Sequence, residues 1–410
     1  MILTSTHGQR DLPRYFARVF HIAGRIGRGR LDFVMPDGRR FRVAGAPGYV
    51  AELRVHDDDV FARLVREGDL GFCDAYIQGD WSTPDLQALL DLLQDDNDML
   101  YDGFPGQILL RAYERMRHLM NANSKRGAKK NISHHYDLGN AFYRVWLDDT
   151  MTYSSALFRD GQESLERAQA RKYASMVSEM GVGPGDHVLE IGCGWGGFAE
   201  HAARQGIRVT GLTISREQHD FAVERIARAG LSDLVQIKLQ DYRDEVGRYD
   251  GIASIEMFEA VGEKYWPTYF NTLKRCLKPG AKATLQIITI TESRFDAYRK
   301  GVDFIQKYIF PGGMLPSKTA LRSEVARAGL AVRHQISFGD SYSLTLRRWF
   351  DMFNGGWDRI APMGFDDRFR RMWNFYLTSC AAAFRSGNCD VVQMTVGLPK
   401  ATGTGKVNAP

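Results

Sequence analysis

The sequence predicts an α/β protein in which a doubly wound, mostly parallel sheet follows a small N-terminal α+β domain. From about residue 165 onward, short apolar runs of strand length alternate with stretches of helix length, and this alternation is typical of βαβ units. Before residue 95, a hairpin pattern and short amphipathic helices occur together. The chain has 410 residues, of which 44% are hydrophobic and 25% charged, so two or three globular domains with buried cores are expected.

A β-hairpin is predicted near the start of the chain. Apolar residues alternate in 31–35 and again in 40–43, and Pro36-Asp37-Gly38-Arg39 between them has the composition of a tight turn. A short helix is predicted over 60–67. These elements belong to the small α+β domain, which we expect to span residues 1–95 and to contact lipid or a partner.

A further helix is predicted to begin soon after this. Ser82 or Thr83 would cap it, because short hydroxyl side chains accept hydrogen bonds from the first free backbone N–H groups, and Pro84 would be its first residue. Its apolar stripe consists of Leu86, Leu89, Leu90 and Leu93.

Residues 96–133 are interpreted as a basic linker that contains a helix. Between residues 111 and 130 there are seven Lys or Arg residues and one acidic residue, Glu114. This stretch is either a solvated helix with a polar loop or a basic arm that lies on anionic lipid headgroups. The last residues, 397–410, are rich in Gly, Thr, Lys and Ala and are expected to be disordered.

The catalytic domain is expected over residues 134–396. Its strands are predicted at 187–191, 207–211, 235–239, 251–255 and 282–290, and two of its helices at 216–229 and 265–276. The connections between parallel strands have the lengths that helical crossovers need. We therefore expect helices on both faces of one sheet.

A glycine-rich turn follows the first of these strands. Val188-Leu189-Glu190-Ile191 is a short apolar strand, and Gly192, Gly194, Gly196 and Gly197 come next, before a helix that begins near Phe198. Glycine is needed where the backbone turns tightly and a ligand approaches it closely. The same pattern would suit a dinucleotide site, so the glycines alone do not identify the ligand.

Residues at the ends of three strands favour S-adenosylmethionine over a dinucleotide. Glu190, just before the glycines, suits a cationic ligand. The second strand lacks the acidic residue that a nicotinamide site places there, and Thr213 and Gln218 supply a hydroxyl and an amide instead. Asp241 and Tyr242, after the third strand, suit the amino group and the ring of adenine. The alternative is a nucleotide fold with another ligand.

Several classes of protein are disfavoured. The five cysteines form no C-x-x-C pair, so neither a zinc site nor a disulfide framework is predicted, and no metal is expected. No N-terminal apolar segment and no uncharged apolar run of about 18 residues occurs, so we expect a cytoplasmic protein whose contact with a membrane is peripheral. The net charge of +5 is compatible with an anionic surface but does not require one.

Motifs along most of the chain resemble the cyclopropane-fatty-acyl-phospholipid synthase family, which includes the mycolic acid cyclopropane synthases. The resemblance covers about residues 30–395. The matching motifs are His135-Tyr136-Asp137-Leu138-Gly139-Asn140, Met151-Thr152-Tyr153-Ser154, Leu189 to Gly197, Gly211-Leu212-Thr213-Ile214-Ser215, Phe258-Glu259, Lys307-Tyr308-Ile309-Phe310-Pro311-Gly312-Gly313, Phe338-Gly339 with Tyr342, and Cys380-Ala381-Ala382-Ala383-Phe384.

The resemblance implies a Rossmann-like class I methyltransferase that acts on a cis double bond of an unsaturated phospholipid acyl chain at the inner membrane surface. The alkene takes the methyl group of S-adenosylmethionine, and loss of a proton from that methyl closes a cyclopropane ring. A bicarbonate ion accepts the proton in family members. No nucleic acid partner is implied, and a homodimer is left open.

The resemblance also implies roles for individual residues. Glu259 and Tyr342 would lie at the bicarbonate and the reaction centre. Together with the residues taken from the strand ends, the candidate cofactor contacts are Tyr136, Thr152, Tyr153, Ser154, Glu190, Gly192, Gly194, Gly196, Thr213, Gln218, Asp241 and Tyr242.

Three positions depart from the best-known family members. Ser155 and Gln286 stand where those members carry Cys and His, and Ala260 replaces a His after Glu259. A glutamine can hydrogen-bond an anion but cannot take up a proton near neutral pH, as a histidine can. Ser155 and Gln286 are therefore added to the candidate reaction centre, and so is Ile288, two residues after Gln286 on the same predicted strand. A cyclopropane product is favoured, and a methyl-branched or methylene-bearing chain is the alternative.

Two further alternatives come from other classes of protein. One is a lipid-binding protein that has lost catalysis, and the other is an N-methyltransferase of a soluble amine. Apolar residues within 294–310 follow a helical period, which indicates either a helix that caps an acyl tunnel or an ordinary core helix. This stripe consists of Phe295, Tyr298, Val302, Ile305 and Ile309.

Overall fold

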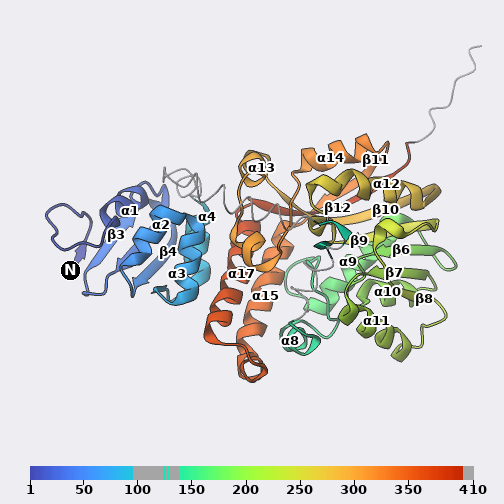
Figure 1. Cartoon of the computed structure of the whole chain (residues 1–410), viewed down its shortest axis with the longest axis horizontal. Helices are drawn as coiled ribbons and strands as arrows, with labels where there is room; N and C mark the ends of the chain where they lie inside the picture. Colours follow the sequence, from blue (N-terminus) through green and yellow to red (C-terminus); the bar gives the residue numbers. More distant parts are fainter. Residues whose placement is uncertain (96–122, 126, 129–137, 400–410) are drawn as a thin grey trace, which may run out of the picture. The chain divides into compact units, whose positions relative to one another are not determined.

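The computed structural model describes residues 1–95, 123–125, 127–128 and 138–399 (Figure 1). Two compact units can be distinguished. The first comprises residues 1–169, 289–315 and 338–391, and the second comprises 170–288, 316–337 and 392–410. Each unit is described by itself.

A seven-stranded sheet forms the centre of the second unit, in the order β11-β12-β10-β9-β6-β7-β8. Neighbouring strands from β10 to β8 run parallel, and β11 pairs antiparallel with β12. The strand order reverses between β6 and β9, where ligands bind in doubly wound sheets. The predicted fold class is confirmed. The strands are β6 (His187–Ile191), β7 (Arg208–Thr213), β8 (Val235–Leu239), β9 (Tyr249–Ile255), β10 (Leu277–Ile290), β11 (Ala331–Ser337) and β12 (Cys389–Gly397).

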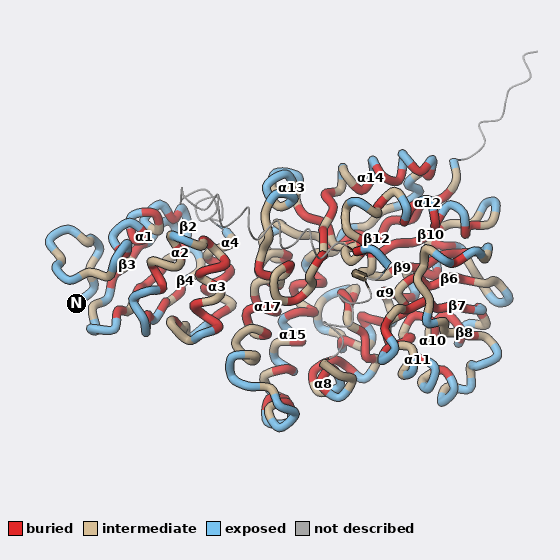
Figure 2. Tube along the Cα trace, in the orientation of Figure 1, coloured by how far each residue is buried: buried red, intermediate tan, exposed pale blue. Residues whose placement is uncertain are grey.

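Three helices pack against β6 and β7 and bury a continuous apolar core. Tyr173, Met176 and Val177 of α9 meet Phe198 of α10 and Ile226 of α11 there. Figure 2 shows the central strands as largely buried, whereas the edge strands β8 and β11 are more exposed. The helices of this unit are most of α9 (Leu165–Met180), α10 (Gly197–Ala203), α11 (Arg216–Arg228), η1 (Tyr242–Asp244), η2 (Phe258–Ala260), η3 (Glu263–Tyr265), α12 (Trp266–Cys276) and α14 (Lys318–Arg327).

The predicted elements of this sheet agree closely with the observed ones, with one difference. Strand β10 begins at Leu277, five residues before the predicted start. The pairing with β9 shifts between Leu277 and Lys282, so the segment with Pro279 and Gly280 bulges out of the ladder. Proline and glycine are unfavourable within strands, so their presence argues against a strand in a sequence-based prediction. A bulge accommodates both residues.

A separate five-stranded sheet belongs to the N-terminal part of the first unit, in the order β1-β3-β2-β4-β5. The predicted hairpin is confirmed, since β2 and β3 pair antiparallel with Phe33 opposite Phe41. Phe16 packs on both rings with centroid distances of 5.6 and 4.9 Å. The elements are β1 (Ile2–Leu3), α1 (Phe16–Ala23), β2 (Arg28–Val34), β3 (Arg40–Ala44), β4 (Ala46–Val55), α2 (Asp59–Glu67), α3 (Asp69–Gln78), β5 (Trp81–Ser82) and α4 (Leu86–Asp95).

The predicted cap of α4 was wrong. Ser82 ends strand β5, and α4 begins only at Leu86. The side chain of Asp85 accepts a hydrogen bond from the backbone N–H of Ala88 at 2.9 Å, as an N-cap does. Thr83 instead accepts a bond from the N–H of Asp85 at 3.3 Å in the preceding turn.

Two long helices that the sequence analysis did not predict, α15 and α17, pack against each other in the rest of the first unit. The hydroxyl of Ser343 on α15 donates to the carbonyl of Ala381 on α17 at 2.9 Å. The remaining elements are α8 (Asn140–Trp146), α13 (Glu292–Tyr298), η4 (Ile305–Ile309), α15 (Gly339–Gly355), α16 (Trp357–Ile360), η5 (Ala361–Met363) and α17 (Asp367–Arg385).

The helical stripe predicted within 294–310 is not one helix. It is divided between α13, none of whose residues is buried, and the short π-helix η4. Asp303 and Gln306 bond each other's backbone N–H groups at 2.8 and 3.1 Å, which ends the helical ladder between the two pieces. Phe304 and Ile309 are buried, whereas Phe295 is only partly buried.

Asp85→Ala should loosen the first turn of α4. Removing an N-cap of this type costs about 1 kcal/mol, so the N–H of Ala88 should exchange with deuterium about fivefold faster. Hydrogen-exchange mass spectrometry of the peptide that contains residues 84–92 measures this. Thr83→Ala is the matched control and should have a smaller effect. A larger effect of Thr83→Ala would show that the cap is assigned to the wrong residue.

Candidate active site

The glycine turn after β6 lies directly against the segment that follows β9. The N–H groups of Gly192 and Cys193 both donate to the carbonyl of Leu212, at 3.0 and 2.9 Å, which anchors the turn to β7. Gly192 has a φ of +82°, and a Cβ there would lie 2.8 Å from Cγ of Met257. Only glycine therefore allows this close approach.

The next glycine leaves room for a ligand. Gly194 has a φ of +51°, and a Cβ there would meet no heavy atom of the described residues within 4 Å. Gly196 ends the turn, and α10 begins immediately after it. Backbone N–H groups at a helix start, with open space in front of them, form a cradle for a polar ligand.

Thr213 and Gln218, both predicted as cofactor contacts, lie together at the end of β7. Their side chains are joined by a hydrogen bond of 3.0 Å from Oγ1 of Thr213 to Oε1 of Gln218. Ser215 caps α11 by accepting from the N–H of Gln218 at 3.3 Å. The bond fixes the orientation of the amide, whose Nε2 has no hydrogen-bond partner among the described residues and can donate to a ligand.

Glu190, at the end of β6, is enclosed by protein, with 2% of its surface exposed. Burial raises the pKa of this carboxyl well above its usual range, although the charges of Arg225 and Lys172 act in the opposite direction. Oε2 accepts no hydrogen bond from the described residues. A direct contact between Glu190 and a cationic ligand stays a prediction.

Asp241 and Tyr242 follow β8 as predicted, but Asp241 is already engaged. Both of its oxygens accept from the guanidinium of Arg243, at 2.8 and 2.6 Å. The ring of Tyr242 packs edge-on against Tyr269 at a centroid distance of 5.7 Å. An adenine amino group would compete with Arg243 for Asp241, so this contact also stays a prediction.

Glu259, predicted at the reaction centre, lies on η2 just beyond β9. Its Oε1 accepts a hydrogen bond of 2.5 Å from the backbone N–H of Ile288, which places these two candidates in contact. The residue as a whole is half-buried, but Oε2 is enclosed and has no hydrogen-bond partner in the described part of the chain. Burial, with a contribution from the neighbouring charge of Glu256, raises the pKa of Glu259 to about 8.

Gln286 belongs to a buried chain of hydrogen bonds that the sequence analysis missed. Its Nε2 donates to Oε1 of Glu256 at 2.8 Å, and its Oε1 accepts from Nε2 of Gln393 at 3.1 Å. The hydroxyl of Ser175 in turn donates to Gln393 at 2.8 Å. Glu256 has a φ of +49°, which is rare for a residue other than glycine. An acidic residue directly after β9 was the sequence signal that could have identified it.

The remaining candidates lie in the first unit, where loop 151–158 is bound to α15. The N–H of Ala156 donates to Thr345 at 3.2 Å, and that of Phe158 donates to Ser341 at 3.1 Å. Ser155 is fully buried, and its hydroxyl donates to the carbonyl of Ala156. Thr152 and Ser154 are buried in the same loop.

An aromatic cluster brings Tyr153 and Tyr342 to the same place in this unit. The ring of Trp349 lies 5.2 Å from that of Tyr153 and 6.0 Å from that of Tyr342, measured between centroids. The hydroxyls of Tyr153 and Tyr376 are hydrogen-bonded at 2.7 Å, and Tyr342 also contacts Phe384 at 4.6 Å. Trp349 and Tyr376 were missed, although Tyr342 and Trp349 are seven residues apart and so share one face of a helix.

The candidates are thus gathered into two groups, one in each unit. Glu190, the glycines, Thr213, Gln218, Asp241, Tyr242, Glu259, Gln286 and Ile288 belong to the second unit, and Thr152, Tyr153, Ser154, Ser155 and Tyr342 belong to the first. Tyr136 lies outside the described residues, as does most of the predicted basic linker. Within the described residues, no group of His, Cys, Asp and Glu side chains could hold a metal ion.

Comparisons with known proteins agree on one family. The sequence profile of mycolic acid cyclopropane synthetases matches residues 123–394. The chain is 40% identical over 355 residues to a tuberculostearic acid methyltransferase of Mycobacterium tuberculosis, which covers 84% of this chain and 82% of that protein. It is 36% identical over 350 residues to a cyclopropane-fatty-acyl-phospholipid synthase of Escherichia coli K12, which covers 84% of this chain and 87% of that protein.

A solved structure with the same fold carries ligands. The mycolic acid cyclopropane synthase complexed with SAH and CTAB matches with a TM-score of 0.61 and 29% identity, over 65% of this chain and 97% of that one.

Gly192→Ala should weaken the binding of S-adenosylhomocysteine about tenfold or more, because backbone strain and the clash with Met257 together amount to about 1–3 kcal/mol. Isothermal titration calorimetry measures the change. Gly230→Ala is the control, since its φ of +67° gives similar strain without any described heavy atom within 4 Å. The double variant Gly192→Ala with Met257→Ala should regain part of the affinity. Unchanged binding of S-adenosylhomocysteine by Gly192→Ala would show that this turn does not contact the ligand.

Proposed function

Since the chain belongs to the cyclopropane-fatty-acyl-phospholipid synthase and fatty acid methyltransferase family, and is an S-adenosylmethionine-dependent C-methyltransferase with a class I fold, we propose that its substrate is a cis double bond in an unsaturated phospholipid acyl chain. The methyl group moves from the sulfonium to one alkene carbon, and loss of a proton from that methyl then closes a cyclopropane ring. The reaction takes place at the cytoplasmic surface of the inner membrane.

One observation carries this proposal: the glycine turn and the carboxyl-bearing segment after β9 are in contact. Gly192 meets Met257, two residues before Glu259. A cofactor held by the turn would therefore present its sulfonium near a carboxylate. Such a charge stabilises the positive charge as it moves from sulfur to carbon.

The chain's own residues meet the physical requirements of this reaction. An alkene is a weak nucleophile and has no proton to lose first, so the site must align it with the methyl group and exclude water. Tyr342 and Trp349 are buried and Tyr153 is partly buried, and the three rings form an aromatic cluster whose faces are suited to a carbocation. We assign Glu259 to the cationic centre.

The residues present also fit a bicarbonate ion. Oε2 of Glu259 is a buried oxygen without a partner among the described residues, and in its ionised form it can accept the O–H of bicarbonate. Bicarbonate, when bound, supplies a base for the departing proton. The amide of Gln286 is fixed on one side by Glu256 and on the other by Gln393, and it cannot take up the departing proton itself.

A second candidate product is a methyl-branched or methylene-bearing chain. Gln286 replaces the histidine of the best-known cyclopropane synthases and cannot take up a proton. A relative with 40% identity is named a methyltransferase and not a cyclopropane synthase. Loss of a proton from a chain carbon next to the cation gives a methyl-branched alkene, in which the added methyl keeps its three hydrogens. A shift of hydride from the methylated carbon to the cationic carbon, followed by loss of a proton from the added methyl, gives a methylene-bearing chain.

The protein should contact lipid from one side of the bilayer. Over the described residues, no helix combines the length and apolar character that a membrane crossing requires. The surface of a membrane that contains unsaturated phospholipid is the partner we propose.

Incubation with unsaturated phospholipid vesicles and methyl-labelled cofactor should yield a labelled fatty acid that is heavier by one CH₂, as a cyclopropane is. Mass analysis of the released fatty acids measures this, and two additional hydrogens, which an added hydride donor would have to supply, would indicate a saturated methyl branch. Proton NMR separates a cyclopropane from a methylene product of equal mass. Saturated phospholipid is the control. Label on a soluble amine, with none on lipid, would contradict the proposed substrate class.

Glu259→Gln should lose most methyl transfer, on the order of 100-fold, while it keeps its affinity for S-adenosylhomocysteine. The carboxyl must be ionised, and its pKa of about 8 in the ligand-free protein means that kcat/KM should rise with pH until about 8 and then level off. The variant should lack this rise. Glu217→Gln, at an exposed position of α11, is the control. Near-normal turnover of Glu259→Gln would show that the carboxylate of Glu259 is not needed for methyl transfer.

A further inference from the structure

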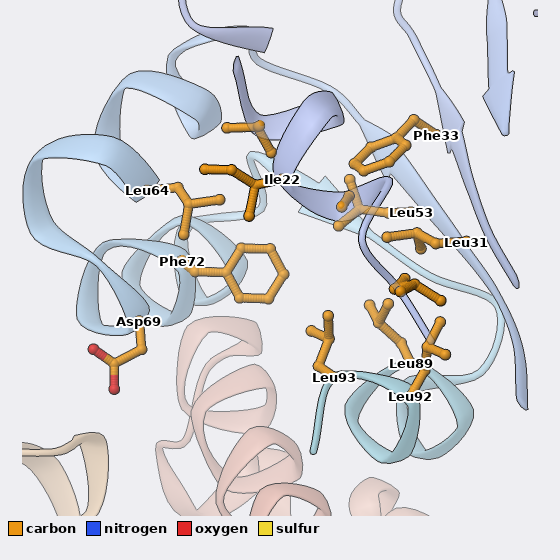
Figure 3. A pocket seen from close by; sticks show the side chains of 13 residues that line it. Ile22, Leu31, Phe33, Leu53, Leu64, Asp69, Phe72, Leu89, Leu92 and Leu93 are labelled. Carbon is orange, nitrogen blue, oxygen red and sulfur yellow. The ribbon is translucent and has the colours of Figure 1, made fainter. Parts of the chain in front are cut away.

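The N-terminal part of the first unit contains an apolar cavity of about 100 Å³ (Figure 3). Side chains from the sheet and from all four helices of this part line it, and Asp69 is its only charged one. The carboxylate of Asp69 points away from the apolar side chains in Figure 3. The lining consists of Val19, Ile22, Ala23, Ile26, Leu31, Phe33, Leu53, Leu64, Asp69, Phe72, Leu89, Leu92 and Leu93.

The size and chemistry of this cavity suit a hydrocarbon and not water. A water molecule needs two to four polar partners, and apolar cavities of roughly 150 Å³ in other proteins stay dry and bind small hydrocarbons. The cavity of about 100 Å³ is large enough for a segment of an unbranched hydrocarbon chain. Cores are close-packed, so a void of this size in a domain of fewer than 100 residues is unusual.

Helix α1 supplies part of the cavity wall and carries basic residues on its exposed face. Ile22 and Ala23 face the cavity. Arg18 and His21 on the helix, with Arg14 and Arg25 in the turns at its two ends, are exposed. Their spacings of four, three and four residues place them along one face of a helix.

These arginines and Arg28, at the start of β2, have no ion-pair partner in the part of the chain that the structure describes. Arg14, Arg18, Arg25 and Arg28 make no salt bridge with a carboxylate of the described residues. By contrast, the exposed Arg40 and Arg54 of the N-terminal sheet both form ion pairs with Glu52. Arg25 and Arg28 flank Ile26, which lines the cavity, so the positive charge lies beside the apolar site.

We propose that the N-terminal domain binds an anionic phospholipid, with the end of one acyl chain in the cavity and the phosphate at Arg18, Arg25 and Arg28. Guanidinium groups bind phosphate through paired hydrogen bonds, and the cavity removes apolar surface from water. This lipid site is separate from the catalytic residues. It would hold the enzyme on an anionic membrane while other lipids react.

Photolabelling of the full chain tests the acyl part of the site. Phosphatidylglycerol with a diazirine near the end of one acyl chain is incorporated into vesicles, and labelled peptides are identified by mass spectrometry. We expect labels in 19–26 and 89–93. Ala23→Phe should reduce these labels on the order of tenfold, because the new ring fills the cavity. Ala17→Phe, on the exposed side of the same helix, is the matched control and should keep them. Leu93→Gln, at a partly exposed lining position, should also reduce labelling if Ala23→Phe does not fold.

Charge variants test the headgroup part. Arg18→Gln with Arg25→Gln should weaken binding to phosphatidylglycerol vesicles about 25-fold, since each basic side chain near an anionic surface contributes about fivefold. Arg40→Gln with Arg54→Gln removes the same charge from paired arginines and should have a much smaller effect. Binding to phosphatidylcholine vesicles should not distinguish the variants.

The outcomes separate this proposal from the proposed function. Absence of label in 19–26 and 89–93, or equal loss in Ala17→Phe and Ala23→Phe, would overturn the cavity as an acyl site. Equal effects of the two arginine pairs would overturn the phosphate site. Labels that persist while no methylated fatty acid forms would contradict the catalytic assignment and leave the lipid site standing.

Discussion

The candidate active site depends on one close contact, between the glycine turn after β6 and the segment after β9. Gly192 has no side chain, so its backbone reaches Met257, and a Cβ would approach within 2.8 Å. Because β6 and β9 are parallel neighbours, their carboxyl ends lie at the same edge of the sheet, where the strand order reverses. The glycine turn and the segment that carries Glu256 and Glu259 are adjacent for this reason.

Burial then determines the chemistry of these carboxyl groups. An enclosed carboxyl in low dielectric resists ionisation, and a second carboxyl nearby adds to the effect, so the pKa of Glu259 rises to about 8. A cationic cofactor reverses this tendency. Ionisation of such a carboxyl would be favoured beside a sulfonium or a carbocation. The buried chain from Glu256 through Gln286 to Gln393 fixes the amide that stands in place of a family histidine.

Two apolar sites of the described residues differ in the kind of hydrocarbon that they suit. The aromatic cluster of Tyr153, Trp349 and Tyr342 offers π faces as well as apolar surface, which suits a chain that becomes positively charged. The cavity behind α1 offers aliphatic surface and Phe33 and Phe72, which suits a chain that does not react. Arg18 and Arg25, which make no salt bridge within the described residues, lie close in sequence to residues that line this cavity, and a phosphate could bind them.

The sequence by itself determined the parallel sheet, the hairpin and the glycine turn, because these depend on local periodicity, turn residues and spacing, whereas Glu259 was proposed only from the resemblance to a family. Tertiary structure decided what depends on neighbours distant in the chain. It moved the α4 cap to Asp85, divided the stripe in 294–310, and joined Gln286 to Gln393 across 107 residues. It also enclosed Oε2 of Glu259, and burial of one atom has no signature in a sequence because every surrounding element contributes to it.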